Sequence, residues 1–244
     1  MTQSSPPHVP RYDSGPLFAD TGLKLGVFGL NVTSAGAVTA SPNRHEIGWD
    51  QNLRLVQAAE AAGFEAAIPF SRWRGFEGRT NPWGASFEPY AWAAALAART
   101  SRIAIFTTSH CLTVSPVMAA KQIATIDAVS HGRVGLNVVA GWFAKELQMF
   151  GVETLDHGRP LRLLGGVARN PAPALARGAP RLRPQGTVAH GRGRLQQAHT
   201  APAPHPPLMN AAFSPRGHQL AARYADVAFV SAFDPAGSGT QGPG

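Results

Sequence analysis

Asn137 is the residue whose type and position most clearly indicate chemistry. It lies inside the apolar run Arg133–Ala140, where Val134, Leu136 and Val138 mark a buried strand. A buried amide must find hydrogen-bond partners, because an unpaired polar group away from water is costly. Two interpretations stay open: a core amide satisfied by neighbouring backbone, or an amide that binds a heterocycle at the open end of the fold.

Two further segments have the composition of anion-binding turns. Ser214-Pro215-x-Gly217 precedes a predicted helix, whose free backbone N–H groups and positive end would face a phosphate. The alternative is that Ser214 only caps this helix and Pro215 only starts it. Ser71-x-x-Arg74, with Arg72, forms a basic cluster after a predicted strand, and its alternative is a solvated charged loop.

The remaining reactive side chains indicate less. Glu146, on the helix after the fourth predicted strand, is either a surface charge or a side chain that reaches the same open end; taken alone, it is expected to be a surface charge. Cys111 is the single cysteine of the chain, which excludes a disulfide framework and a multi-cysteine metal site. The nine histidines never fall into H-x-x-x-H or H-E-x-x-H spacing, so no metal site is expected.

Apolar strands alternate with helices along most of the chain, and this alternation predicts a parallel sheet with helices on its faces. The predicted strands are Leu23–Leu30, Phe64–Phe70, Arg102–Thr108, Arg133–Ala140, Pro207–Ala212 and Asp226–Ala232. The predicted helices are Trp49–Ala62, Phe87–Thr100, Ser115–Val129 and Pro215–Tyr224, with a further start at Gly141-Trp142.

Polar residues follow the predicted strands, at Asn31, Ser71-Arg72, Thr107–His110, Asn137 and Asn210–Ser214. Such clustering at carboxyl strand ends is typical of a (β/α)₈ TIM barrel. A doubly wound dinucleotide fold is the alternative, but Gly26-x-x-Gly29 does not supply a G-x-G-x-x-G fingerprint. We therefore predict an α/β fold: an incomplete (β/α)₈ barrel with about six of the eight strands present.

One segment accounts for most of the net charge of +8. Pro160–Pro204 holds seven arginines, no acidic residue and no Phe, Trp or Tyr, and is dominated by Ala, Gly, Pro and Arg. Such a composition is not expected to form a packed core. It is interpreted as a disordered linker, as a basic arm for RNA, or, the interpretation favoured here, as GC-rich sequence read out of frame. The arm lacks the aromatic residues that stack on bases.

The chain accordingly divides into five parts. We expect a disordered N-terminal arm at 1–22, the first part of the barrel at 23–159, the anomalous disordered segment at 160–204, the barrel continuation at 205–235 and a disordered tail at 236–244. No apolar run approaches the roughly 18–20 residues that span a bilayer, and the N-terminus lacks a secretory apolar region. We expect a cytoplasmic protein with no membrane and no nucleic-acid partner.

The sequence around the fourth predicted strand resembles a known family signature. Residues 124–142 read A-T-I-D-x-x-S-x-G-R-x-G-x-N-x-V-x-G-W. This is similar to the bacterial luciferase-like flavin monooxygenases, in the branch of alkanesulfonate, dimethylsulfone and pyrimidine monooxygenases. Asn210-Ala211-x-x-Ser214-Pro215-x-Gly217 and A-A-x-Y-A-D at 221–226 resemble the family's later phosphate-side segment, and Arg74-Gly75-Phe76-x-Gly78 resembles its pyrimidine-ring-opening members.

The resemblance implies a barrel monooxygenase that oxidises a small organic molecule with molecular oxygen and reduced FMN. A separate NAD(P)H-dependent flavin reductase would supply the FMN, and intact relatives are expected to be homo-oligomers. Asn137 and Thr108 would border the oxygen-activating face. The implied flavin-binding residues are Ser71, Arg72, Asn137, Glu146, Arg159 and Ser214. Trp73, Phe76, Trp83 and Trp142 suit the water-excluding wall that such chemistry needs.

The chain departs from the family pattern after Arg159, and the last two strand-helix units are missing from it. We therefore expect the chain as written to be a truncated form that is impaired and poorly soluble. A deazaflavin-dependent oxidoreductase on the same barrel is the alternative enzyme, and an Arg-rich nucleic-acid-binding protein is the non-enzymatic alternative.

Overall fold

The computed structural model describes residues 15–20, 22–152, 206–211 and 215–229. Six parallel strands form one sheet in sequence order: β1 (Gly26–Phe28), β2 (Ala66–Ile68), β3 (Ala104–His110), β4 (Val134–Val139), β5 (Leu208–Ala211) and β6 (Val227–Phe229). Each strand pairs with the next one along the chain. A doubly wound sheet reverses its strand order at a switch point, so this order confirms the barrel prediction and excludes the alternative.

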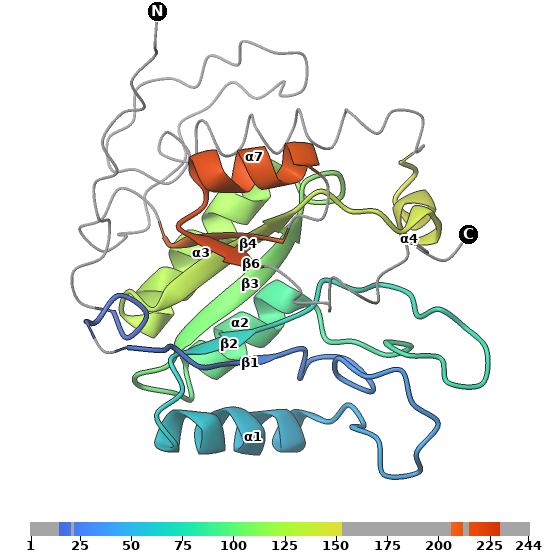
Figure 1. The fold of residues 1–244 in the computed structure, drawn as a ribbon, viewed down its shortest axis with the longest axis horizontal. Coiled ribbons are helices and arrows are strands. Elements are labelled where there is room, and N and C mark those ends of the chain that lie inside the picture. The colour runs from blue at the N-terminus through green and yellow to red at the C-terminus, as the bar shows by residue number, and fades with distance from the viewer. Residues whose placement is uncertain (1–14, 21, 153–205, 212–214, 230–244) are drawn as a thin grey trace, which may run out of the picture.

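Helices connect these strands and cover the outside of the sheet. They are α1 (Trp49–Ala61), α2 (Pro89–Ala97), α3 (Pro116–Ser130), α4 (Ala144–Met149) and α7 (Pro215–Tyr224). Figure 1 shows the strands between α1 on one side and α7 on the other. Among the described helices, none has the length and apolar character needed to cross a bilayer.

The sheet is curled rather than flat. β1 and β6 are the first and last strands in the sheet order, and in a flat sheet they would lie about 24 Å apart. The rings of Phe28 in β1 and Phe229 in β6 nevertheless have centroids only 4.9 Å apart. The inner faces of the outermost strands therefore meet, as expected of strands arranged around a barrel axis.

Alternation along the strands separates two packing layers. Ala104 and Phe106 of β3 pack with Ile68 and Met209 in an inner cluster. Residues of the opposite parity, such as Ile105, pack with the helices in an outer cluster. Side chains two residues apart on a strand point to the same face, so Thr108 and His110 continue the inner row that begins at Ala104.

Three predicted boundaries require correction. The sequence predicts a helix over Phe87–Thr100, whereas α2 begins at Pro89. The Glu88 carboxylate accepts a hydrogen bond from the Ala91 N–H at 2.7 Å, and Pro89 has no N–H to leave unpaired, so the helix starts there. The third strand does not end at Thr108, because it pairs with β4 as far as His110 and Val139. The helix predicted from Gly141-Trp142 begins at Ala144.

The amino ends of the strands are held by two charged side chains. Arg133 donates to the carbonyl oxygens of Ile103 at 2.7 Å and of Ala97 and Thr100 at 2.9 Å. Glu60 at the end of α1 accepts hydrogen bonds from three consecutive backbone N–H groups, those of residues 101–103. Leu17, within the predicted N-terminal arm, packs against the inner cluster.

Gly135 tests how tightly the inner layer is packed. A Cβ at this position would lie 2.5 Å from the ring of Phe106, which is fully buried. We expect Gly135→Ala to lower the free energy of unfolding by about 1–3 kcal/mol, because the ring has no free space to move into. Gly36→Ala is the matched control, since nothing lies within 4 Å of its added Cβ. Urea unfolding measures both, and equal stabilities of the two variants would contradict the packing described.

Glu60 gives the fold a pH dependence of known sign. Burial raises its pKa, but the backbone N–H groups of Ile103, Arg102 and Ser101 outweigh that effect and hold the pKa below its ordinary value. Its stabilisation is therefore present at neutral pH and is lost as the pH falls through the folded-state pKa. We expect Glu60→Gln to cost about 1 kcal/mol at pH 7, after solvent screening, and less at pH 3, because the wild-type carboxyl takes up its proton as the pH falls. Unfolding measured at both pH values checks this; an equal loss at both would refute it.

Candidate active site

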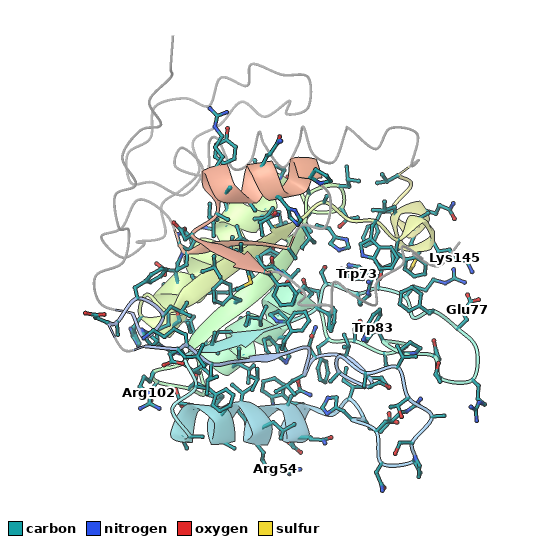
Figure 2. All side chains as sticks on the ribbon, viewed as in Figure 1. Arg54, Trp73, Glu77, Trp83, Arg102 and Lys145 are labelled. Atoms are coloured by element: carbon teal, nitrogen blue, oxygen red, sulfur yellow. The ribbon has the colours of Figure 1, made fainter. Side chains whose placement is uncertain are left out.

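The inner row of side chains becomes polar at the carboxyl ends of the strands. Figure 2 shows Trp73 and Trp83 at this end of the molecule and Arg102 at the other. Five of the predicted site residues are described there, and all five are buried, namely Ser71, Arg72, Thr108, Asn137 and Glu146. Arg159 and Ser214 lie outside the described residues.

Thr108 and Asn137 form a hydrogen-bonded pair across β3 and β4. The two residues are in register, and the Asn137 Nδ2 donates to the Thr108 Oγ1 at 3.1 Å. The Thr108 hydroxyl donates in turn to the carbonyl oxygen of Pro69 at 2.6 Å. Because the hydroxyl proton is used on Pro69, Thr108 can only accept from the amide, which fixes the Asn137 NH₂ toward Thr108.

This orientation leaves the other amide atom of Asn137 free. The Oδ1 is buried and has no hydrogen-bond partner among the described residues. Each interpretation of Asn137 therefore holds for one atom of the amide. The nitrogen is satisfied within the protein, and the oxygen is available as an acceptor. A buried acceptor without a partner calls for a ligand or a water.

Arg72 and Glu146 form a buried ion pair beside this row. The Arg72 Nη1 lies 3.0 Å from the Glu146 Oε2, and the side chains are 7% and 1% exposed. The second carboxylate oxygen accepts from the backbone N–H of Trp73 at 2.8 Å and of Arg74 at 3.2 Å. The expectation that Glu146 is a surface charge is wrong, because α4 packs its first turn against the loop that follows β2.

Aromatic rings surround the Arg72 guanidinium. Its central carbon lies 4.9 Å from the ring centroids of Trp83 and Trp142 and 5.6 Å from that of Phe76. Ring faces attract a cation and keep water away from it. Burial lowers the pKa of Arg72, and the neighbouring Glu146 raises it. The solvated-loop interpretation of this cluster is therefore wrong for Arg72, although Arg74 is exposed and pairs with Glu77.

His110 is a site residue to which sequence reasoning gave no role. It is the last residue of β3, 6% exposed, and its Nδ1 has no hydrogen-bond partner among the described residues. Burial and the charge of Arg72 lower the pKa of His110 to about 4, so the ring is neutral near pH 7. The available signal was its position two residues after Thr108, which places both side chains on the inner face of the strand.

The site has the character of a binding site for a planar polar ring. Of the eight buried side-chain polar atoms that have no partner among the described residues, three belong to this site: the Asn137 Oδ1, the His110 Nδ1 and the Arg72 Nε. A flavin ring carries both hydrogen-bond donors and acceptors along its edge, so this set fits one. The described residues contain no group of three or more His, Cys, Asp and Glu side chains that could hold a metal ion.

Comparison with known proteins gives a consistent picture. The family described as luciferase-like monooxygenase matches residues 23–243. The pyrimidine monooxygenase RutA of Serratia proteamaculans is 36% identical over 130 residues, which cover 53% of this chain and 36% of that protein. RutA of a Bradyrhizobium species is 38% identical over 132 residues, with coverages of 53% and 36%. These alignments thus span little more than a third of the relatives' length.

Solved structures resemble the fold at lower identity. A riboflavin lyase, RcaE, crystallised with modified FMN and riboflavin, has a TM-score of 0.72 at 22% identity and covers 88% of this chain and 55% of its own. The EDTA monooxygenase EmoA of Chelativorans sp. BNC1 has a TM-score of 0.64 at 18% identity, with coverages of 85% and 53%. At these identities the likeness supports the barrel fold.

Glu146 allows the buried ion pair to be tested. We expect Glu146→Gln to lower the free energy of unfolding by about 3–5 kcal/mol, because it leaves the Arg72 charge buried without a counter-charge. Glu77→Gln is the matched control, since the Glu77 pairs with Arg74 and Lys145 are exposed and should contribute nothing measurable. Urea unfolding of both variants is the measurement. Equal effects would show that the Arg72 charge is satisfied by other groups.

Proposed function

Since this chain belongs to the luciferase-like monooxygenase family, we propose that it takes part in a two-component monooxygenase reaction. In this proposal the substrates are molecular oxygen and a small organic molecule, and the cofactor is reduced FMN. A separate NAD(P)H-dependent flavin reductase supplies the cofactor. The pyrimidine ring is the first substrate class to test, because the curated relatives are named for it.

One observation carries this proposal. The Thr108–Asn137 pair lies buried at the carboxyl end of the sheet, with an amide oxygen that has no partner among the described residues. In barrel enzymes the chemistry takes place at this end of the strands. The fixed orientation of the Asn137 amide suits a heterocycle edge that donates a hydrogen bond. The alternation of side chains along β3 and β4 supports a position of this amide on the inner face of the barrel.

Each described site residue has a task in this proposal. When bound, reduced FMN supplies the electrons that activate oxygen, which amino-acid side chains cannot do. Asn137 and Thr108 orient the ring edge through the amide and the hydroxyl. Arg72, held by Glu146, places a fixed positive charge beside the ring. Phe76 and Trp83, which are half-buried, would exclude water from the reacting centre, whereas Trp73 and Trp142 are 39% and 61% exposed.

The activity is tested by reconstitution. The chain is mixed with FMN, NADH, a flavin reductase and uracil under air, and uracil consumption is followed by chromatography. We expect slow loss of uracil, since the chain is expected to be an impaired form, and this loss should require the reductase, FMN and oxygen together. Oxidation of an alkanesulfonate in place of uracil would keep the reaction class and change the substrate class. Turnover with a reduced deazaflavin in the absence of oxygen would replace the proposal by the deazaflavin alternative.

Asn137 gives the proposal a residue-level test. We expect Asn137→Ala to reduce kcat/KM by about 100-fold, because the ring loses a preorganised partner. Asn210→Ala is the matched control on the next strand. Asn210 pairs with Val138, so it lies on the outward face, where its Nδ2 donates to the Val138 carbonyl at 2.6 Å. The control should lose about 1 kcal/mol of stability and keep its turnover. Equal losses of turnover would contradict the assignment of Asn137.

A further inference from the structure

We infer that His110 is a further flavin-binding residue, which contacts the ring system of the cofactor rather than its phosphate. The inference rests on the proposed function, because it assumes that a flavin occupies the carboxyl end of the barrel. It concerns a residue that neither the sequence signature nor the predicted site includes. Three features of His110 support it: where the side chain lies, what lies near it, and what its ring can do.

The first feature is the position of the His110 side chain. His110 is buried at the carboxyl end of β3 and lies on the same face as Phe106 and Thr108. A Cβ added to Gly141 would lie 3.6 Å from the His110 Nδ1, so the ring packs against backbone that carries no side chain. The Nδ1 has no hydrogen-bond partner among the described residues. A buried nitrogen without a partner, on the strand face that carries Thr108, calls for a ligand atom or a water.

The second feature is which residues lie near His110. Thr108 is two residues back on the same strand face, which is about 7 Å along the strand, and it holds Asn137. Arg72, in the loop after β2, is near enough for its charge to lower the pKa of the His110 ring, after the larger effect of burial. A ring system that contacts the Thr108–Asn137 pair and extends toward Arg72 would therefore lie within reach of His110.

The third feature is the chemistry of the His110 imidazole. A neutral imidazole has one nitrogen that donates a hydrogen bond and one that accepts. It carries no charge with which to pair a phosphate, and the adjacent guanidinium opposes its protonation. His110 is thus suited to a polar edge atom of a neutral heterocycle and unsuited to an anion. This distinguishes the isoalloxazine ring from the phosphate of FMN.

The test is a flavin titration that needs no turnover. FMN and riboflavin are titrated separately into the wild-type chain, His110→Leu and His110→Asn, and binding is followed by flavin fluorescence. Leu fills the ring volume without a polar atom, and Asn places a polar atom near the Nδ1 position. We expect His110→Leu to weaken both flavins by the same factor, about 10-fold for one lost hydrogen bond. His110→Asn should recover most of the affinity.

A control and a second readout separate binding from structural support. Thr107→Val changes the neighbouring outward-facing position of β3, whose buried hydroxyl has no partner among the described residues, and it should leave flavin affinity unchanged. Without flavin, His110→Leu should unfold at or above the wild-type temperature, because it removes an unsatisfied polar atom. A purely structural role gives the opposite pair of results: a lower unfolding temperature and unchanged affinity.

The outcomes are distinguishable. Affinities of His110→Leu within about twofold of wild type for both flavins would overturn the inference and leave the proposed function standing. A loss confined to FMN would also overturn it, because the contact would then be with the phosphate. A wild-type chain that binds neither flavin would overturn the proposed function itself, and the inference with it.

Discussion

A short chain of hydrogen bonds joins three neighbouring strand ends, and the rest of the site depends on it. The Asn137 amide donates to the Thr108 hydroxyl, which donates to the Pro69 carbonyl just after β2. The chain requires the register in which Thr108 faces Asn137, since a slip of one residue would turn one of the two side chains toward the helices. Two residues earlier on each strand, the Phe106 ring of β3 fills the space that Gly135 of β4 leaves open, and this packing holds the register in place.

The Arg72–Glu146 pair extends this arrangement from the strands to the loops. Moving two charges out of water costs several kcal/mol each, so a buried pair is poor evidence of added stability. Its value here is geometric: one carboxylate binds the guanidinium and two backbone N–H groups of the loop after β2. The loop cannot change conformation without breaking all three contacts. The aromatic rings therefore pack around a cation whose position is already fixed.

Much of the fold could be predicted from the sequence, because apolar runs bounded by glycine and polar residues specify buried parallel strands. The strand that reaches His110 was predicted too short, since a histidine at a strand end resembles the start of a loop. Asn137 and Thr108 could be located because a polar side chain within an apolar strand is conspicuous. Glu146 was placed in the site by the family resemblance alone, because its burial depends on a loop some 70 residues earlier in the chain, and periodicity within one helix carries no information about that contact. The predictions for Arg159, Ser214 and the segment 160–204 remain predictions.

The two ends of the sheet differ in how completely their polar groups are satisfied. At the amino end, the Arg133 guanidinium donates to the carbonyl oxygens of Ala97, Thr100 and Ile103, and one Glu60 oxygen accepts from three N–H groups. At the carboxyl end, the Asn137 Oδ1 and the His110 Nδ1 are buried without partners among the described residues. Each such atom costs the fold about 1–3 kcal/mol unless a ligand or a water satisfies it. A ligand that paired with the two inward-facing atoms would regain that free energy on binding, as the proposed flavin site at the carboxyl end requires.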